Sequence, residues 1–129
     1  MIKTKFQKSN TNSKYKNVTT IVDGIIFDSK AEAAYYAELK LRERAGLIKI
    51  KQLQPAIKMT QAQIKYISDF AIIEDGCEVW IDVKGVSNAV FLLKKRLYKK
   101  YGKNILRIVK KNNDRFDLLE EITPEGFED

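Results

Sequence analysis

Asp69 and Asp82 are the residues of this sequence whose spacing points most directly to chemistry. They lie in the stretch 64–86, IKYISDFAIIEDGCEVWIDVKGV, where Asp75-Gly76 separates two alternating strand-like runs. Asp-Gly in that setting predicts a hairpin with a two-residue turn. Counting six positions outward from each turn residue then pairs Asp69 with Asp82, with Cβ atoms about 5 Å apart.

Two facing carboxylates need a compensating positive charge, because like charges in such a pair are destabilising. Lys84 lies two residues beyond Asp82 and therefore on the same face, about 7 Å along the strand. Two carboxylates that converge beside a lysine predict a divalent-cation site.

The residue types available restrict what such a site could bind. The sequence has no histidine and a single cysteine, Cys77, which excludes an internal disulfide, the usual zinc ligands and the commonest general base. Oxygen ligands would have to hold any metal, which favours Mg²⁺ or Mn²⁺. We interpret Cys77 as structural rather than nucleophilic, and Trp80, on the Asp82 face, as packing rather than base-stacking.

The overall composition predicts one soluble domain. A chain of 129 residues can bury a real core, and 44% hydrophobic with 32% charged residues is typical of globular proteins. No apolar run approaches the roughly 20 residues of a membrane span, and the lysine-bearing N-terminus lacks the apolar core of a signal peptide. We therefore expect a cytoplasmic protein without a membrane partner.

The net charge of +7 combines two parts of opposite sign. Residues 1–111 carry 23 Lys/Arg against 10 Asp/Glu, or +13, whereas residues 112–129 carry one Arg against seven acids, or −6. A basic body favours nucleic acid held through its phosphates, although a solvated basic surface has the same composition. Residues 1–17 hold five lysines and no acids, which predicts a mobile basic arm, either touching a ligand or an ordinary disordered terminus.

The segment before the central hairpin predicts a smaller hairpin and a helix. A second Asp-Gly pair indicates a hairpin over 18–27, and Asp28 or Ser29 then caps a helix that runs to about Ala45. Glu32 has two interpretations here. It fits a capping box with Ser29, and it also shares a helical face with large apolar residues, where a buried carboxylate would have a partner.

The segment 47–59 alternates apolar and polar residues up to Pro55, so it predicts an edge strand with a break or bulge. Gln54 and Lys58 either face a ligand or, as is commoner for strand residues, face solvent.

Residues 87–102 predict a helix with the apolar stripe Val90, Leu93, Leu97 and Tyr101. Its basic exposed surface would include Lys94, Lys95 and Lys99. A strand over 104–110 would then complete a right-handed parallel unit with the central hairpin. The acidic segment 112–129 contains one apolar patch, FDLLEEI, which is either a terminal helix or a partner contact.

The predicted order of elements, helix, strand, strand, strand, helix, strand, resembles the PD-(D/E)xK nuclease superfamily. The motifs VDGIIFDSKAEAAYYAELK, ERAG, YISDF and DVKG are similar to a phage-encoded branch related to Holliday-junction resolvases. The resemblance covers residues 14 to about 110. Ser68 stands where the proline of the superfamily's name would be, and that proline is not a metal ligand.

This resemblance implies a restriction-endonuclease-like α/β fold: an αβββαβ core with a mixed sheet flanked by helices, preceded by an N-terminal β-hairpin. Residues 18–111 would form the nuclease domain, between the arm 1–17 and an acidic C-terminal tail, 112–129. Asp69, Asp82, Glu32 and the carbonyl of Val83 would bind Mg²⁺, with Mn²⁺ as a substitute. Lys84 would orient or deprotonate the attacking water.

The implied activity is metal-dependent hydrolysis of phosphodiester bonds in DNA, leaving a 5′-phosphate and a 3′-hydroxyl. The resemblance further implies a homodimer that cleaves branched DNA in phage recombination or packaging. The DNA-binding residues would be Lys14, Lys16, Lys94, Lys95 and Lys99. Two alternatives remain, a non-catalytic nucleic-acid-binding module of the same fold and a restriction- or transposase-like nuclease.

Overall fold

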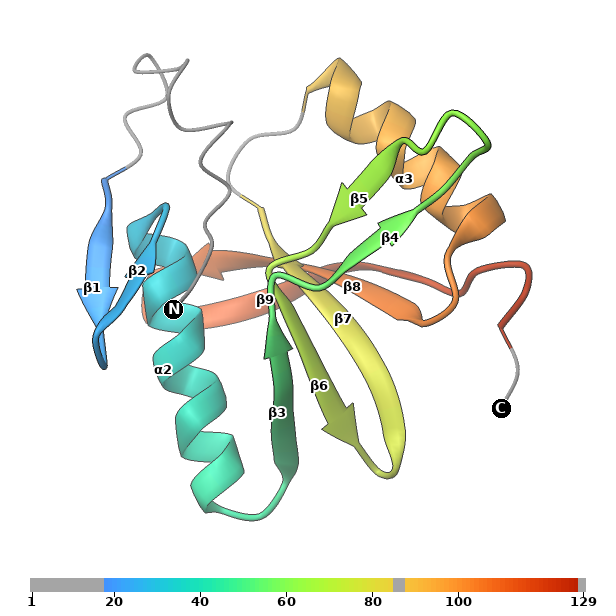
Figure 1. Cartoon of the computed structure of the whole chain (residues 1–129). Coiled ribbons are helices and arrows are strands. Elements are labelled where there is room, and N and C mark those ends of the chain that lie inside the picture. The colour runs from blue at the N-terminus through green and yellow to red at the C-terminus, as the bar shows by residue number, and fades with distance from the viewer. Residues whose placement is uncertain (1–17, 85–87, 128–129) are drawn as a thin grey trace.

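The computed structural model describes residues 18–84 and 88–127, which build a five-stranded mixed sheet with two helices (Figure 1). The strand order is β3-β6-β7-β8-β9, and neighbours are antiparallel except for the parallel pair β7–β8. The strands are β3 (Ile48–Leu53), β6 (Phe70–Glu74), β7 (Cys77–Val83), β8 (Ile105–Asn112) and β9 (Arg115–Ile122). No helix in these two described ranges is long and apolar enough to span a membrane.

The remaining elements are two helices and two small hairpins. Helix α2 (Lys30–Arg44) precedes β3, and α3 (Ala89–Tyr101) connects β7 to β8. The hairpins are β1 (Thr20–Val22) with β2 (Ile25–Phe27), and β4 (Ala56–Lys58) with β5 (Lys65–Ile67). Figure 1 shows α2 with β1–β2 on one side of the molecule and α3 with β4–β5 on the other. The predicted α/β class and the mixed sheet are confirmed.

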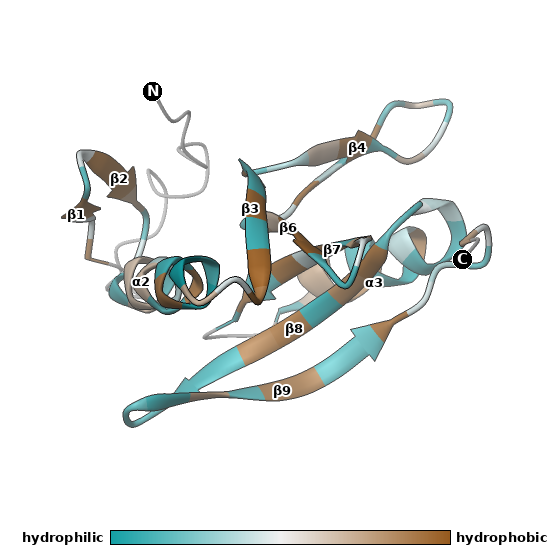
Figure 2. Ribbon diagram, turned by 90° about the horizontal axis from the view of Figure 1, so that it is seen from below, coloured by the Kyte–Doolittle hydropathy of each residue, from teal (hydrophilic) through white to brown (hydrophobic). Residues whose placement is uncertain are grey.

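Two apolar clusters pack on opposite faces of the sheet because strand side chains alternate. On one face, Tyr35 and Leu39 of α2 pack against the strands, and β7 contributes Ile81. On the other face, Tyr98 of α3 packs against Trp80 of β7. Figure 2 shows hydrophobic and hydrophilic blocks along β8 and β9, and β8 is apolar on both faces over its first half.

The central hairpin has the predicted register. Asp75 and Gly76 form a two-residue turn with φ values of 53° and 78°, both in the left-handed region that such turns require. Phe70 pairs with Ile81, so Asp69, the next residue outward, lies opposite Asp82.

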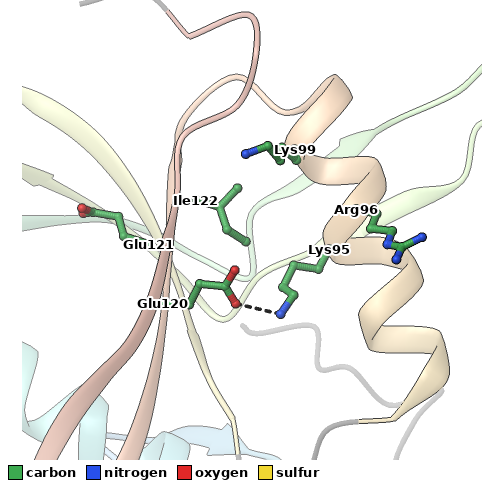
Figure 3. Close-up of a pocket in the computed structure, with 6 residues that line it drawn as sticks. All are labelled: Lys95, Arg96, Lys99, Glu120, Glu121 and Ile122. Atoms are coloured by element: carbon green, nitrogen blue, oxygen red, sulfur yellow. Dashed lines mark hydrogen bonds and ion pairs between the residues drawn. The ribbon is translucent and has the colours of Figure 1, made fainter.

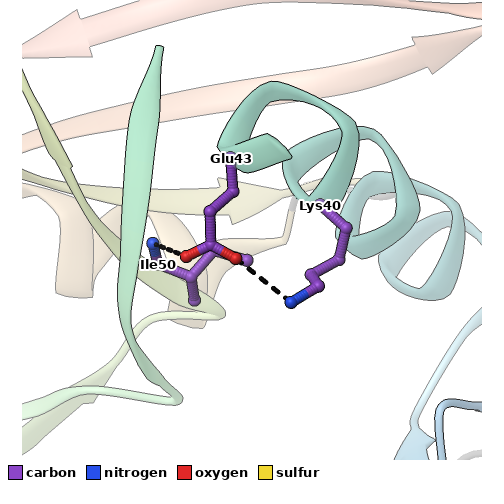
Figure 4. A network of polar contacts seen from close by, with 3 residues as sticks. All are labelled: Lys40, Glu43 and Ile50. Carbon is purple, nitrogen blue, oxygen red and sulfur yellow. Dashed lines mark hydrogen bonds and ion pairs between the residues drawn. The ribbon is translucent and has the colours of Figure 1, made fainter. Parts of the chain in front are cut away.

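Helix α2 begins and ends as predicted. The Ser29 side chain accepts a hydrogen bond from Glu32 N at 3.1 Å, and Gly46 follows the helix with a φ of 79°. Figure 4 shows how the last turn is joined to β3: Glu43 Oε2 accepts from Ile50 N at 3.0 Å, and Oε1 pairs with Lys40 Nζ at 3.1 Å. The Ile50 hydrogen bond is the main reason why the pKa of Glu43 is lowered, with Lys40 adding to it.

The predicted stripe of α3 is right for Leu97, which packs against the buried cluster, and wrong for Val90, Leu93 and Tyr101, which are exposed. Val90 and Leu93 are 62% and 58% exposed, whereas Tyr98 is fully buried and Phe91 packs beside it. The side of α3 that packs in the core is therefore the one that carries Phe91 and Tyr98. Tyr98 satisfies its hydroxyl there by donating to Asn104 O at 2.7 Å, while its ring packs in the core.

The acidic segment differs from the predicted C-terminal tail, because FDLLEEI is a strand of the sheet and not a terminal helix. It belongs to β9, which pairs antiparallel with β8 through a two-residue turn in which Asn113 has a φ of 59°. The acids of β9 pair with the basic body: Arg107 contacts Glu121 at 3.0 Å, and Lys95 contacts Glu120 at 2.7 Å. These ion pairs accompany the backbone ladder with β8 and the burial of Ile122, which hold a strand whose apolar pattern is weak.

The predicted edge strand is β3, whose pairing with β6 shifts register between Ile50 and Gln52, and the predicted break at Pro55 leads to a separate hairpin. The chain leaves β3, forms the β4–β5 hairpin, and returns to the sheet at β6. Pro55 O accepts from Ser68 N at 2.9 Å and closes the base of this excursion. The hairpin packs on the α3 face through Met59 and Tyr66.

Candidate functional site

Asp69 and Asp82 lie together beside the open end of the β6–β7 pair, and each is only 4% exposed. Asp69 N donates to Asp82 Oδ1 at 3.1 Å, and Val83 N donates to Asp69 Oδ2 at 2.8 Å. Each carboxylate is therefore oriented by a backbone N–H of the other strand.

Tyr66 of β5 is a member of this site that the sequence analysis missed. Its hydroxyl donates a short hydrogen bond to Asp82 Oδ2, and its ring lies 5.1 Å from the ring of Tyr98, centroid to centroid. Burial, together with the negative charge of Asp82, raises the pKa of Tyr66 far above its ordinary value. The phenol therefore stays protonated and remains a donor. The available signal was its position in YISDF, three residues before Asp69.

Ser68, which stands in place of the superfamily's proline, is fully buried. Its hydroxyl donates to Ile81 O at 2.8 Å. This bond ties the residue before Asp69 to the residue before Asp82. Ser68 thus holds the two strands together where the carboxylates meet.

Lys84 lies at the end of β7 on the α3 side. Its backbone N donates to Val109 O at 2.8 Å, which continues the ladder between β7 and β8. Its Nζ lies 3.9 Å from the centroid of the Phe91 ring, a cation–π geometry. Phe91 packs against the cluster that contains Tyr66, so the ammonium lies on the same face of the sheet as the Asp82 side chain.

Glu32 is buried on α2, at 8% exposure. The Ser29 hydroxyl lies 3.4 Å from Glu32 Oε1 and accepts from Glu32 N, as in a capping interaction. Helix α2 packs on the sheet face opposite to the one that carries the Asp82 side chain. Within residues 18–84 and 88–127, no group of three or more His, Cys, Asp or Glu side chains is placed to hold a metal ion.

The donor set at Asp69 and Asp82 fits a hard divalent cation. It consists only of oxygens, which Mg²⁺ and Mn²⁺ prefer. The hydrogen bonds to Asp69 Oδ2 and Asp82 Oδ1 fix both carboxylates, and a carboxylate oxygen that accepts one hydrogen bond has a second lone pair. Mg²⁺ is commonly held by one or two carboxylates and keeps several waters, so two aspartates suffice.

The lysines predicted to contact DNA are only partly accessible. Lys14 and Lys16 lie outside the described residues. On α3, Lys99 is exposed, Lys94 is half-buried, and Lys95 is half-buried in its ion pair with Glu120. Figure 3 shows Lys95 reaching toward β9 while Arg96 points away from it. The pocket drawn there lies between α3 and β9 and is lined by Lys95, Arg96, Lys99, Glu120, Glu121 and Ile122.

Residues 12–114 match a family model described as a protein of unknown function (DUF1064). This range contains both aspartates, Lys84 and Tyr66, and it ends just before β9. A search of the curated proteins found no match.

Proposed function

This chain belongs to the DUF1064 family of proteins of unknown function, and we propose that it is a Mg²⁺-dependent endodeoxyribonuclease of the PD-(D/E)xK type. The observation that carries the proposal is the pair of buried carboxylates, Asp69 and Asp82, with Lys84 directly after the end of the strand that carries Asp82. The order α2, β3, β6, β7, α3, β8 supports the restriction-endonuclease-like fold that forms part of the proposal.

In this proposal Asp69 and Asp82 hold the cation, together with the carbonyl oxygen of Val83. A bound divalent cation would lower the pKa of the attacking water and offset the charge that develops on the scissile phosphate. The backbone N–H groups that orient both carboxylates reduce the reorganisation needed when a substrate binds. Tyr66 and Ser68 hold this arrangement from the side of β5.

Lys84 is the proposed residue that acts on the water and the phosphate. Its ammonium would orient the nucleophile and add positive charge near the transferred group. The Phe91 ring under Nζ keeps the side chain on the face of Asp82. Glu32 stays a prediction from the resemblance as a further ligand, because the contacts described above are those of a helix cap.

The proposed substrate is branched DNA, cleaved by a homodimer during phage recombination or packaging. Cleaving two strands symmetrically requires two copies of the site, which a two-fold dimer provides. The basic body supplies shape-directed, salt-sensitive binding through phosphates.

The test is cleavage of labelled four-way junctions and matched linear duplexes by the purified protein with Mg²⁺, with EDTA, and with EDTA followed by excess Mn²⁺. We expect cleavage with either metal and none in EDTA. Asp82→Asn and Lys84→Ala should each lower the rate about 100-fold or more while DNA binding persists. Asp117→Asn, an equivalent change on β9 away from the site, is the control. Equal cleavage of junction and duplex would contradict the selectivity, and no cleavage of any DNA would contradict the enzyme.

A non-catalytic nucleic-acid-binding module is the second candidate. It is favoured by the lack of a third carboxylate grouped with Asp69 and Asp82 in the described residues. Such a module would bind DNA without metal-dependent cleavage. Wild type and Asp82→Asn would then give the same result in the cleavage assay.

A further inference from the structure

The β4–β5 hairpin carries two lysines directly opposite each other. Lys58 pairs with Lys65 in the antiparallel register, and both side chains are exposed. Facing side chains in such a pair have Cβ atoms about 5 Å apart, and like charges in this position are destabilising. The arrangement therefore costs stability unless a negatively charged partner offsets it.

The surrounding sequence provides no such partner. Residues 44–68 contain five Lys/Arg and no Asp or Glu. None of the ion pairs formed among the described residues includes Lys58 or Lys65. The lysines of α3 differ, because Lys95 pairs with Glu120 at 2.7 Å and Lys100 with Glu125 at 3.5 Å.

The opposite side of the same hairpin is fixed to the candidate site. Ile57 pairs with Tyr66, and both pack on the α3-side cluster. The Tyr66 hydroxyl donates to Asp82. Because strand side chains alternate, Lys58 and Lys65 project from the other side of the hairpin, one residue from the pair that packs. The two charges are thus carried on the outer side of a hairpin whose inner side contacts Asp82 through Tyr66.

We propose that the β4–β5 hairpin is a DNA-contacting arm in which Lys58 and Lys65 each bind a phosphate of the DNA that the protein holds. This inference rests on the proposed function. A DNA backbone supplies the negative charge that the hairpin lacks. The tip adds Gln61 and Gln63, both exposed, whose amides can donate to phosphate oxygens.

The experiment measures binding rather than cleavage. Fluorescence anisotropy in EDTA, with a labelled linear duplex and a labelled four-way junction, gives Kd over a range of salt concentrations. For the double variant Lys58→Gln/Lys65→Gln we expect the slope of log K against log salt to fall by about 1.8, because each phosphate contact contributes about 0.9. At 0.1 M salt the same relation gives a Kd about 60-fold higher.

Two further variants separate local contacts from net charge and from folding. Lys49→Gln/Lys110→Gln makes the same charge change at exposed positions of β3 and β8 and should keep the wild-type slope. Lys58→Arg/Lys65→Arg keeps both charges and should restore binding.

The possible failures are distinct. If the wild-type protein binds DNA but the double glutamine variant keeps its slope and Kd, the hairpin inference is wrong and the proposed function stands. An equal loss in both glutamine double variants would also overturn the inference, since net charge alone would explain it. If the wild-type protein binds neither DNA, both proposals fail.

Discussion

Replacing Tyr66 by phenylalanine removes one buried hydroxyl and leaves its ring in place. In the wild-type protein that hydroxyl donates to Asp82 Oδ2, and both side chains are almost fully buried. A hydrogen bond to a charged group contributes about 1.5–3 kcal/mol, and a buried acceptor that loses its donor keeps the desolvation penalty. We therefore expect Tyr66→Phe to lower the free energy of unfolding by about 1.5–3 kcal/mol.

Tyr98→Phe is the matched control. Its ring lies 5.1 Å from that of Tyr66, but its hydroxyl donates to a neutral acceptor, Asn104 O, at 2.7 Å. The expected loss is about 0.5–1.5 kcal/mol. For a domain of this size, 1 kcal/mol corresponds to roughly 4 °C in Tm, so the two variants should differ measurably.

The assay is urea unfolding at pH 7 without divalent cations, followed by circular dichroism. Equal m-values for wild type and both variants would show that the comparison concerns stability alone. If Tyr66→Phe costs no more than Tyr98→Phe, the hydroxyl does not support a charged Asp82, and the reasoning about how the site is held together fails.

Two further predictions concern the carboxylates of α2. The pKa of Glu43 is lowered by the Ile50 hydrogen bond and by Lys40, so its contribution is present above the ordinary Glu pKa of about 4.3 and is lost as the pH falls through the lower folded value. The difference in unfolding free energy between wild type and Glu43→Ala should be constant from pH 6 to 8 and shrink below about pH 4; a constant difference at lower pH would contradict this. Glu32→Gln should leave Tm unchanged, because glutamine also serves in a capping box, and should lower Mg²⁺-dependent cleavage about 10-fold or more if Glu32 is a ligand. Unchanged cleavage would leave Glu32 with the cap role alone.

Local turn chemistry made much of the fold predictable. Asp75-Gly76 alone determined which residues of β6 and β7 face each other, and Ser29 with Gly46 determined the extent of α2. These signals are short-range, because a two-residue turn or a helix cap depends on the φ and ψ angles of a few residues. The pairing of Asp69 with Asp82 followed from them.

Features that depend on tertiary packing were not predictable in this way. Tyr66 reaches Asp82 only because the chain leaves the sheet at Pro55 and returns at Ser68, and no periodicity in the sequence encodes that excursion. The buried side of α3 is decided by the fit of Tyr98, not by the most apolar stripe. Strand β9 forms by pairing with β8 and burying Ile122, with its acids in ion pairs to Lys95 and Arg107, and its hydrophobic pattern gives little signal.

The register of the central hairpin has a consequence for how this protein can change length. A single residue inserted within β7 would reverse the alternation beyond it, so the Asp82 carboxylate would move to the α2 face and an aliphatic side chain would take its place. An insertion at Asp75-Gly76 would lengthen only the loop and leave both strands in phase. Viable length variants of this segment should therefore be confined to the turn, because only there does an added residue leave both aspartates facing each other.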